Sequence, residues 1–369
     1  MTAGPAAGAR PAARAAGPGA APAAAPEELA TPLLDAATAR GRAFLGSRFA
    51  ILGGAMTWVS ERNLVSAISN AGGFGVIACG AMPPALLAEE IAATRARTDR
   101  PFGVNLITLH PELPDLIAVC AEARVSHVVL AGGLPPGPAI AAVKDSGARL
   151  LAFATNLAVA RKLLRAGADA LIIEGSEAGG HIGPVSLAVL AQEILPALPE
   201  AVIFAAGGIG RGTAIAALVQ MGASGVQLGT RFAATVESIA HPRFKEAFRR
   251  APARDAVASV QLDPRLPVIP VRALRNAGTE AFLAKQREMV ERLERGEVSL
   301  ETAQLEIEHY WAGALRRAVI EGDVEHGSVM AGQSVGMVTA EEPVADVIAA
   351  LVTEAEAALA RPAGAASGA

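Results

Sequence analysis

Residues 147–175 read GARLLAFATNLAVARKLLRAGADALIIEG and carry the clearest signal of the fold. It contains two short apolar runs, Arg149–Phe153 and Ala170–Glu174, separated by a segment of helical period at Leu157–Ala166. This spacing predicts two parallel strands joined by a crossover helix. A glycine precedes each run and suits a left-handed helix cap ahead of a strand. The repeating unit of the fold is therefore strand, loop, helix, glycine, strand.

The same unit recurs on both sides of this stretch. Six further apolar runs bring the number of predicted strands to eight: Phe49–Leu52, Phe74–Ala78, Pro101–Asn105, His127–Leu130, Ala201–Ala206 and Gly225–Leu228. Helical segments lie between them, among others at Leu64–Asn70, Pro84–Arg97, Ala139–Ser146, Leu187–Leu198 and Ala214–Met221. Eight such units predict an α/β fold of the (β/α)8 TIM-barrel class. A doubly wound open sheet shows the same alternation, so the motifs at the strand ends are needed to distinguish a barrel from an open sheet.

Composition divides the chain into four parts. We expect a barrel over residues 45–240 and, over 241–360, an appended helical lobe and Gly-rich loop that pack on the barrel mouth. Residues 1–26 consist mostly of Ala, Pro and Gly and are expected to be a disordered leader, and 361–369 a disordered tail. In the lobe we expect a charged helical stretch at Thr279–Glu308 and a last helix opened by a Thr339/Glu342 capping box.

Composition also limits the classes of function. The 369 residues are 52% hydrophobic with a net charge of −4, and no dense basic stripe suggests a nucleic-acid surface. No apolar span of membrane length is present, so no membrane partner is expected. Cys79 and Cys120 lie in apolar runs, as reduced core cysteines do, which favours the cytoplasm.

Glycine-rich turns follow the last two predicted strands. Ala205–Gly210 reads AAGGIG and Gln227–Phe232 reads QLGTRF. A phosphate held by backbone N–H groups needs an approach free of Cβ atoms, and in barrels the loops after strands seven and eight are the usual phosphate site. One Gly-Gly pair is often only a turn, but Gly208 and Gly229 at consecutive strand ends favour a phosphate cradle.

The loop after the sixth predicted strand carries the strongest catalytic candidate. Ile173–Gly183 reads IEGSEAGGHIG and sets His181 among four glycines and two carboxylates. Glycines let backbone approach a flat ligand, and histidine exchanges protons near neutral pH. The plainer alternative is that His181 only bonds backbone carbonyls in a tight loop. Glu174 and Glu177 lack further ligands at useful spacing, so no metal is expected.

Two more strand ends suggest a ligand with a flat ring. Leu52–Trp58 places small residues before Met56 and Trp58, which leaves room for a planar ring or simply fills the barrel top. Asn105 ends an apolar strand with an amide, and a buried amide needs a partner. A dinucleotide fingerprint is not indicated, because Gly72–Gly75 precedes a strand where that motif would have to follow one.

With these motifs in view, the chain resembles the nitronate monooxygenase (2-nitropropane dioxygenase) superfamily of FMN-dependent barrels from about Phe49 to Leu351. That superfamily also contains FMN-dependent enoyl-acyl-carrier-protein reductases and NAD(P)H:quinone reductases. The most specific segments are SNAGGFG at 69–75, PFGVN at 101–105, EAGGHIG at 177–183, AGGI at 206–209, GTRF at 229–232 and SVMAGQ at 328–333.

The resemblance implies that FMN lies across the barrel mouth and that His181 is the base in nitronate oxidation. Ala55, Met56 and Thr57 would lie near the flavin ring with Asn105 close by, Gly180 against the ring, and Gly208, Gly229 and Thr230 on the phosphate. The remaining residues expected to contact the cofactor are Gly179, Gly207, Gln227, Met330, Gly332 and Gln333.

The expected activity is that of an FMN-dependent nitronate monooxygenase, which oxidises alkyl nitronates, its small-molecule substrates, with O2. Segment 328–333 and the EAGGHIG loop look closest to the enoyl reductases, whereas Ile51–Ser60 lacks their Gln-Gly-Gly-Met. An NAD(P)H-dependent flavin reductase of the enoyl or quinone type, with NAD(P)H as co-substrate, is therefore the alternative. A barrel that binds FMN without catalysis is a third hypothesis. The lobe helices offer surfaces for a homodimer.

Overall fold

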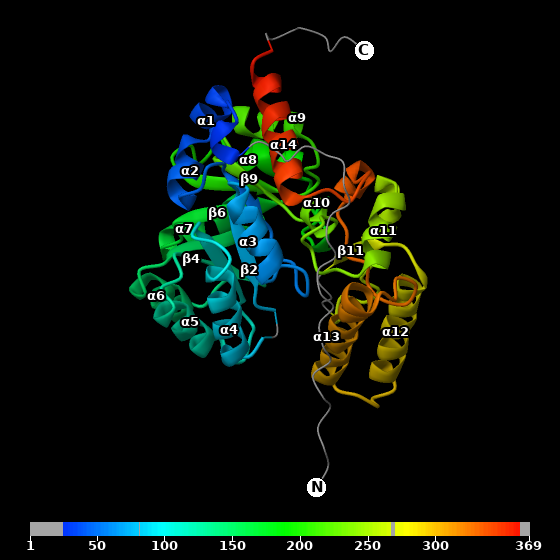
Figure 1. Ribbon diagram of the computed structural model, residues 1–369. Helices are drawn as coiled ribbons and strands as arrows, with labels where there is room; N and C mark the ends of the chain where they lie inside the picture. Colours follow the sequence, from blue (N-terminus) through cyan, green and yellow to red (C-terminus); the bar gives the residue numbers. More distant parts are fainter. Residues whose placement is uncertain (1–24, 81, 267–269, 362–369) are drawn as a thin grey trace.

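The centre of the computed structural model, which describes residues 25–80, 82–266 and 270–361, is a closed barrel of parallel strands (Figure 1). The eight strands are hydrogen-bonded in the order β1-β9-β8-β6-β5-β4-β3-β2, and a parallel bridge from Leu52 to Phe74 joins β1 to β2. The strands are β1 (Ile51–Gly53), β2 (Gly75–Ala78), β3 (Phe102–Ile107), β4 (His127–Ala131), β5 (Arg149–Ala154), β6 (Ala170–Glu174), β8 (Val202–Ala206) and β9 (Gly225–Leu228). The barrel prediction is confirmed, and the open sheet is excluded.

Helices between the strands form the outer layer of the barrel. They are α3 (Arg62–Asn70), α4 (Pro84–Arg95), α5 (Leu113–Glu122), α6 (Gly137–Asp145), α7 (Leu157–Ala166), α8 (Leu187–Ile194) and α9 (Gly212–Gln220). Gly147, Gly167 and Gly222 have φ of 81°, 109° and 107°, so these glycines do adopt the predicted left-handed conformation. A short turn, η1 (Pro26–Glu28), and two short helices, α1 (Pro32–Ala37) and α2 (Ala39–Leu45), precede β1.

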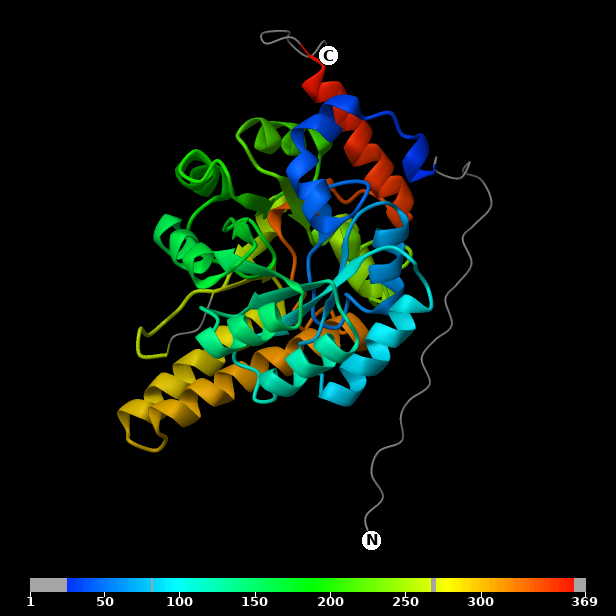
Figure 2. The same ribbon diagram turned by 90° about the vertical axis from the view of Figure 1, so that its left-hand side faces the viewer.

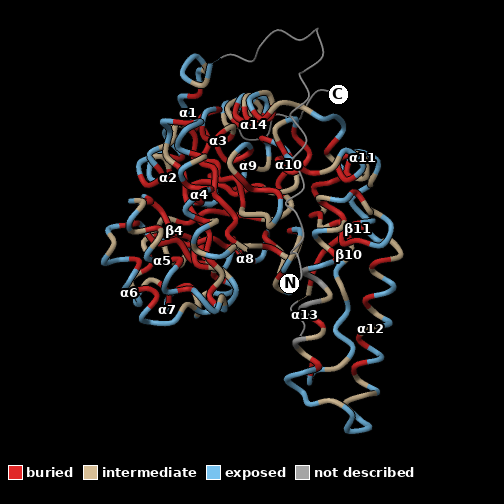
Figure 3. The backbone as a smooth tube through the Cα atoms, turned by 60° about the horizontal axis from the view of Figure 1, so that its bottom comes forward, coloured by how far each residue is buried: buried red, intermediate tan, exposed pale blue. Residues whose placement is uncertain are grey.

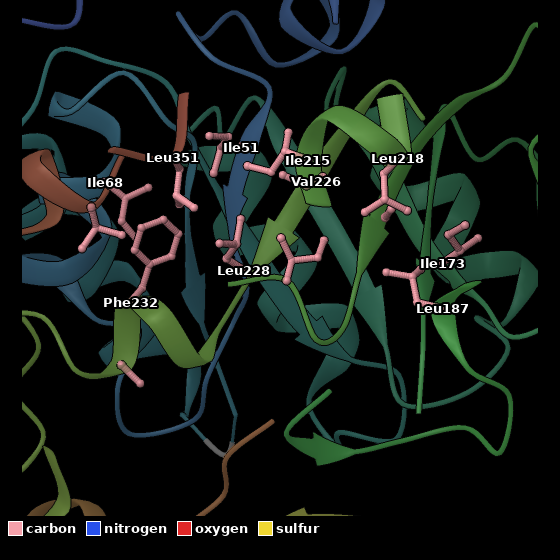
Figure 4. Close-up of a cluster of buried hydrophobic side chains, with 14 of the residues drawn as sticks. Ile51, Ile68, Ile173, Leu187, Ile215, Leu218, Val226, Leu228, Phe232 and Leu351 are labelled. Carbon is pink, nitrogen blue, oxygen red and sulfur yellow. The ribbon is translucent and has the colours of Figure 1, made fainter. Parts of the chain in front are cut away.

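Alternation along each strand separates two cores. Ile51, Ile173 and Val226 point outward and pack against helix residues such as Ile215 and Leu187 (Figure 4). The residues of opposite parity fill the barrel interior, among them Leu52, Phe74, Val129, Leu151, Ile172 and Phe204. Successive side chains of a strand point to opposite faces, so the last inward residue of each strand lies in the top layer of the barrel.

A second, antiparallel sheet joins the barrel to the lobe. Its strands are β10 (Ala256–Ala258), β11 (Val271–Leu274) and the two-residue β7 (Gly180–His181). Beyond it, after α11 (Pro242–Arg250), the chain forms a hairpin of α12 (Ala277–Glu294) and α13 (Leu300–Arg316), which turns at Gly296. The hairpin projects away from the barrel (Figures 1 and 2) and is less buried than the barrel strands (Figure 3).

The last helix, α14 (Val344–Leu359), packs on the barrel wall against α9 and α3 rather than on the mouth. The predicted capping box is wrong: Val344 N donates to both oxygens of Glu237, at 3.0 and 3.1 Å, and the N-cap residue is Pro343. Only the tertiary fold brings Glu237 to this helix end. Of the expected leader and tail, residues 1–24 and 362–369 lie outside the described residues, and the division at residue 240 stays a prediction.

Both cysteines and one histidine belong to the core. Cys79 and Cys120 are free and buried, and burial raises the pKa of Cys79 to about 11 and that of Cys120 to about 12. The His127 ring packs edge-on against Phe44 and Phe74, and burial lowers its pKa to about 4. Within the described ranges, the helices are too short or too polar to cross a membrane.

Candidate active site

Three polar side chains line the top layer of the barrel interior. Their side chains point into the barrel because each residue follows an inward-facing residue of its own strand by two positions. They are Asn105 of β3, Glu174 of β6 and Gln227 of β9. Asn105 is 6% exposed and Gln227 is 8% exposed. Strand register places Glu174 beside Ala206 and Ala206 beside Gln227. The carboxyl ends of strands on opposite sides of the barrel therefore meet in a polar floor made of Asn105, Glu174 and Gln227.

In the described part of the chain, the side chains of the polar floor have no hydrogen-bond partners. Among the described residues, no hydrogen bond joins the side chain of Asn105, Glu174 or Gln227 to another residue. An unpaired buried polar group costs about 1–3 kcal/mol, so such groups normally have a partner in the functional state. Protein surrounds most of the Glu174 carboxyl although part of the residue reaches the mouth, and this burial raises its pKa to about 8. The floor is suited to a ligand that offers both donors and acceptors.

The loop after β1 closes over this floor from one side. Ala55, Met56 and Thr57 are half-buried, as expected for residues at the mouth. The Gln227 side chain packs over Gly54, where a Cβ would lie 3.3 Å from its Cδ. The Met56 sulfur approaches Gly229, 3.5 Å from the position of a Cβ there. The loops after β1 and β9 thus meet at one place.

The predicted phosphate loops lie on neighbouring strands, β8 and β9. Gly207 and Gly208 have φ of 103° and 70°, which only glycine adopts without strain. A Cβ on Gly208 would lie 3.0 Å from Cβ of Glu177, so the turn is packed tightly under the histidine loop. Thr230 Oγ1 accepts a hydrogen bond from Gly332 N at 2.9 Å, which leaves its own O–H free to donate. These loops can present N–H and O–H donors to an anion.

The segment Met330–Gln333 packs directly on the histidine loop. Gln333 N donates to the carbonyl of Glu177 at 2.9 Å. A Cβ on Gly179 would lie only 2.6 Å from Gly332 N, so the two backbones touch where both residues are glycine. The Glu177 carboxylate accepts from Leu187 N at 2.9 Å and caps α8. The close packing of the two backbones is therefore enough to require glycine at positions 179 and 332, whether or not a ligand is bound.

Arg272 is a site residue that the motifs did not reveal. Its guanidinium is buried, donates from Nε to the Ser176 carbonyl at 2.9 Å and from Nη1 to the Ala256 carbonyl at 2.5 Å. Burial lowers its pKa, and the nearby Glu177 carboxylate opposes this effect. An arginine inside the apolar run Val271–Leu274 is the one local signal that could have suggested it. Arg272 ties the histidine loop to the lobe sheet.

His181 lies where the barrel mouth meets the lobe. It is exposed and pairs with Val271 of β11, while Gly180 pairs with Arg272. Residues opposite each other in an antiparallel pair share a face, and Val271 packs with Phe282 and Met289 of the hairpin. His181 therefore stands at the rim, on the face of the lobe sheet that is turned toward the hairpin. Met330 is bridged to Ala273 beside it.

Two other observations bear on the mouth. Trp58 is 42% exposed, has φ of 68°, and has the Arg316 guanidinium of α13 5.9 Å from its ring centroid. A non-glycine residue in this conformation is uncommon and often belongs to a functional site. In the part of the chain that the structure describes, no three His, Cys, Asp or Glu side chains are grouped to hold a metal ion.

Comparisons with known proteins agree with this geometry. Residues 40–354 match the family model described as nitronate monooxygenase. The nitronate monooxygenase of Paraburkholderia phytofirmans is 30% identical over 362 residues, covering 84% of this chain and 93% of that protein. A Mycobacterium tuberculosis protein named (3aS,4S,5R,7aS)-5-hydroxy-7a-methyl-1-oxo-octahydro-1H-indene-4-carboxyl-CoA dehydrogenase is 34% identical, covering 73% of this chain and 69% of that protein.

Solved structures point to the same group. FabK from Thermotoga maritima superposes with a TM-score of 0.77 and 38% identity, covering 86% of this chain and 96% of that chain. Nitroalkane oxidase from Streptomyces ansochromogenes superposes with a TM-score of 0.69 and 28% identity, covering 84% of this chain and 96% of that chain. The family match spans most of the chain, and both barrels share its fold. The chain therefore belongs to the nitronate monooxygenase family and is an oxidoreductase.

Proposed function

We propose that the protein is an FMN-dependent oxidoreductase of the nitronate monooxygenase type, which oxidises alkyl nitronates with O2 and uses His181 as the base. One observation carries this proposal: an exposed imidazole is held by a glycine loop at the rim of a barrel mouth whose polar floor has no partners. Such a combination serves a bound ligand and a proton transfer beside it.

The residues at the mouth fit FMN. The unpaired amides of Asn105 and Gln227 offer donors and acceptors to a flavin ring, and Ala55, Met56 and Thr57 supply the adjoining wall. Gly207, Gly208, Gly229 and the Thr230 hydroxyl would hold the phosphate. Gly179, Gly180, Met330, Gly332 and Gln333 would complete the site from the histidine loop and the segment packed on it. FMN supplies a two-electron acceptor that O2 can reoxidise.

His181 would take up a proton as electrons leave the substrate. Histidine titrates near neutral pH, and its exposed position at the rim lets it exchange that proton with solvent. Arg272 would act on His181 through the loop backbone, because it donates to the Ser176 carbonyl and lies opposite Gly180 in the strand pair. Arg272 is thus a positioning residue.

The test is an anaerobic titration of FMN-loaded protein with propionate-3-nitronate in the absence of NAD(P)H. Flavin bleaching is expected, and His181→Ala should slow it by about 10²–10⁴-fold, the usual contribution of a general base. The control is His326→Ala, since His326 is exposed and bonds only its own turn through Asp323. Failure of every alkyl nitronate to bleach the flavin would sink the proposal. Normal turnover by His181→Ala would favour a different role for the loop.

A second candidate is an NAD(P)H-dependent reductase of an enoyl thioester. The higher identity and TM-score of FabK, together with a relative named as a dehydrogenase of a CoA thioester, favour it. Here NADH or NADPH would bleach the flavin, and a crotonyl thioester would reoxidise it. The same spectra, recorded with both kinds of reductant, separate the two candidates. The buried, reduced cysteines support a cytoplasmic location for either one.

A further inference from the structure

Glu174 carries a carboxyl group that has no role yet in the proposed function, either in proton transfer or in binding the phosphate. It ends β6, and its inward position follows from Ala170 and Ile172, which lie in the interior cluster. Its lateral neighbour on β8 is Ala206, and the next residue in that row is Gln227 of β9. Residues in one row on strands that are separated by a third strand lie roughly 10 Å apart, and the residue between Glu174 and Gln227 is an alanine with only a methyl group. In this row of the barrel, only the small side chain of Ala206 stands between Glu174 and Gln227.

Among the residues that the structure describes, no cation compensates Glu174. On the neighbouring strands, the ends of β5 and β8 carry Phe153, Ala154 and Ala206, none of which titrates. The two charged groups closest along its own loop and the adjoining sheet are already engaged: Glu177 caps α8, and Arg272 bonds two backbone carbonyls. Desolvation is the sole cause of the raised pKa, about 8, of Glu174. At neutral pH the group is therefore a carboxylic acid.

We propose that Glu174 acts as a neutral acid that donates its O–H to the ring bound over the barrel mouth. The inference rests on the FMN of the proposed function. A carboxylic acid offers an O–H donor and a carbonyl acceptor, and the amides of Asn105 and Gln227 offer N–H donors and a carbonyl acceptor. The pyrimidine edge of a flavin alternates carbonyl acceptors with an N–H donor, so the polar floor matches it. An ionised Glu174 would be an acceptor only and would face carbonyl lone pairs.

The proposal predicts that FMN affinity falls as Glu174 loses its proton. If FMN binds only the protonated form, the affinity at a given pH scales with the protonated fraction of the free protein. For a pKa of about 8, raising the pH from about 7 to about 9.5 lowers the affinity about 30-fold. The titrations of FMN itself add to this dependence equally in all variants, so a comparison between variants isolates Glu174.

The experiment is a fluorescence titration of FMN into the full-length apoprotein from pH 6.5 to 9.5. Glu174→Gln keeps a donor and an acceptor and cannot ionise, so it should bind FMN at pH 7 much as wild type does and lack the 30-fold fall. Glu174→Leu, which has neither, should bind about 10-fold more weakly at pH 7, as for one lost hydrogen bond to a buried group. Glu193→Gln, on the exposed face of α8, is the control and should keep the wild-type profile. Circular dichroism checks that each variant is folded.

The outcomes are separable from those of the nitronate test. Superimposable pH profiles for wild type and Glu174→Gln would overturn the role of Glu174, as would equal losses at pH 7 for the Gln and Leu variants. If FMN affinity falls with pH only in the proteins that keep Glu174, and nitronates do not reduce the flavin, the role of Glu174 as an acid is supported and the proposed substrate is refuted. A wild-type protein that does not bind FMN at pH 7 would refute both.

Discussion

Gly179 offers a sharp test of how the histidine loop is held. In Gly179→Ala the new Cβ would lie 2.6 Å from Gly332 N and 2.7 Å from the Ala331 carbonyl carbon. Ordinary contact begins near 3.4 Å, so the two backbones would have to separate by roughly 0.8 Å. That movement strains the hydrogen bonds from Gly332 N to Thr230 and from Gln333 N to Glu177, both 2.9 Å long.

The expected loss of stability follows from these contacts. Two hydrogen bonds at about 1 kcal/mol each and an overpacking cost of about 1 kcal/mol give a loss of about 3 kcal/mol. The matched control is Gly183→Ala in the same loop, where nothing lies within 4 Å of the added Cβ. Urea unfolding measures the stability, and an FMN titration measures the site. Because φ of Gly179 is not positive, backbone strain adds nothing. If the two variants agree within about 0.5 kcal/mol, the packing argument is wrong.

Three further predictions concern buried or capping groups. Burial depresses the pKa of His127 to about 4, so the stability that the neutral imidazole contributes is fully present above pH 6.5 and is lost as the pH falls toward 4. The free energy of unfolding of the wild type should fall by up to about 3 kcal/mol in this window, and His127→Leu should flatten its slope against pH. Glu177→Ala removes the cap of α8 and should cost about 1–2 kcal/mol in urea unfolding, against no change for exposed Glu193→Ala. Glu237→Ala uncaps α14 and should cost about 1 kcal/mol by the same assay; an unchanged midpoint would show that solvent replaces the carboxylate.

The barrel could be predicted from the sequence because its signals are local. The strand and helix periods are set by neighbours a few positions away, and glycines mark the helix ends by their own conformational freedom. The predicted run Gly225–Leu228 and the helix Leu157–Ala166 coincide with β9 and α7. Parallel strands of a barrel all end on one face, so the glycine loops, Asn105 and His181 could also be assigned to one site from their order alone.

The partners of these residues could not be predicted in the same way. Arg272 reaches Ser176 across 96 positions of sequence, and Glu237 caps α14 across 107. The two-residue strand β7 exists only because β11 lies beside it. Whether a polar residue is satisfied depends on every group that folding brings near it, and no local pattern records that sum. Local patterns are therefore enough to predict the barrel and the residues at its mouth. Only tertiary packing leaves Glu174 without a partner among the described residues, presses Gly179 against Gly332 and sets His181 at the rim.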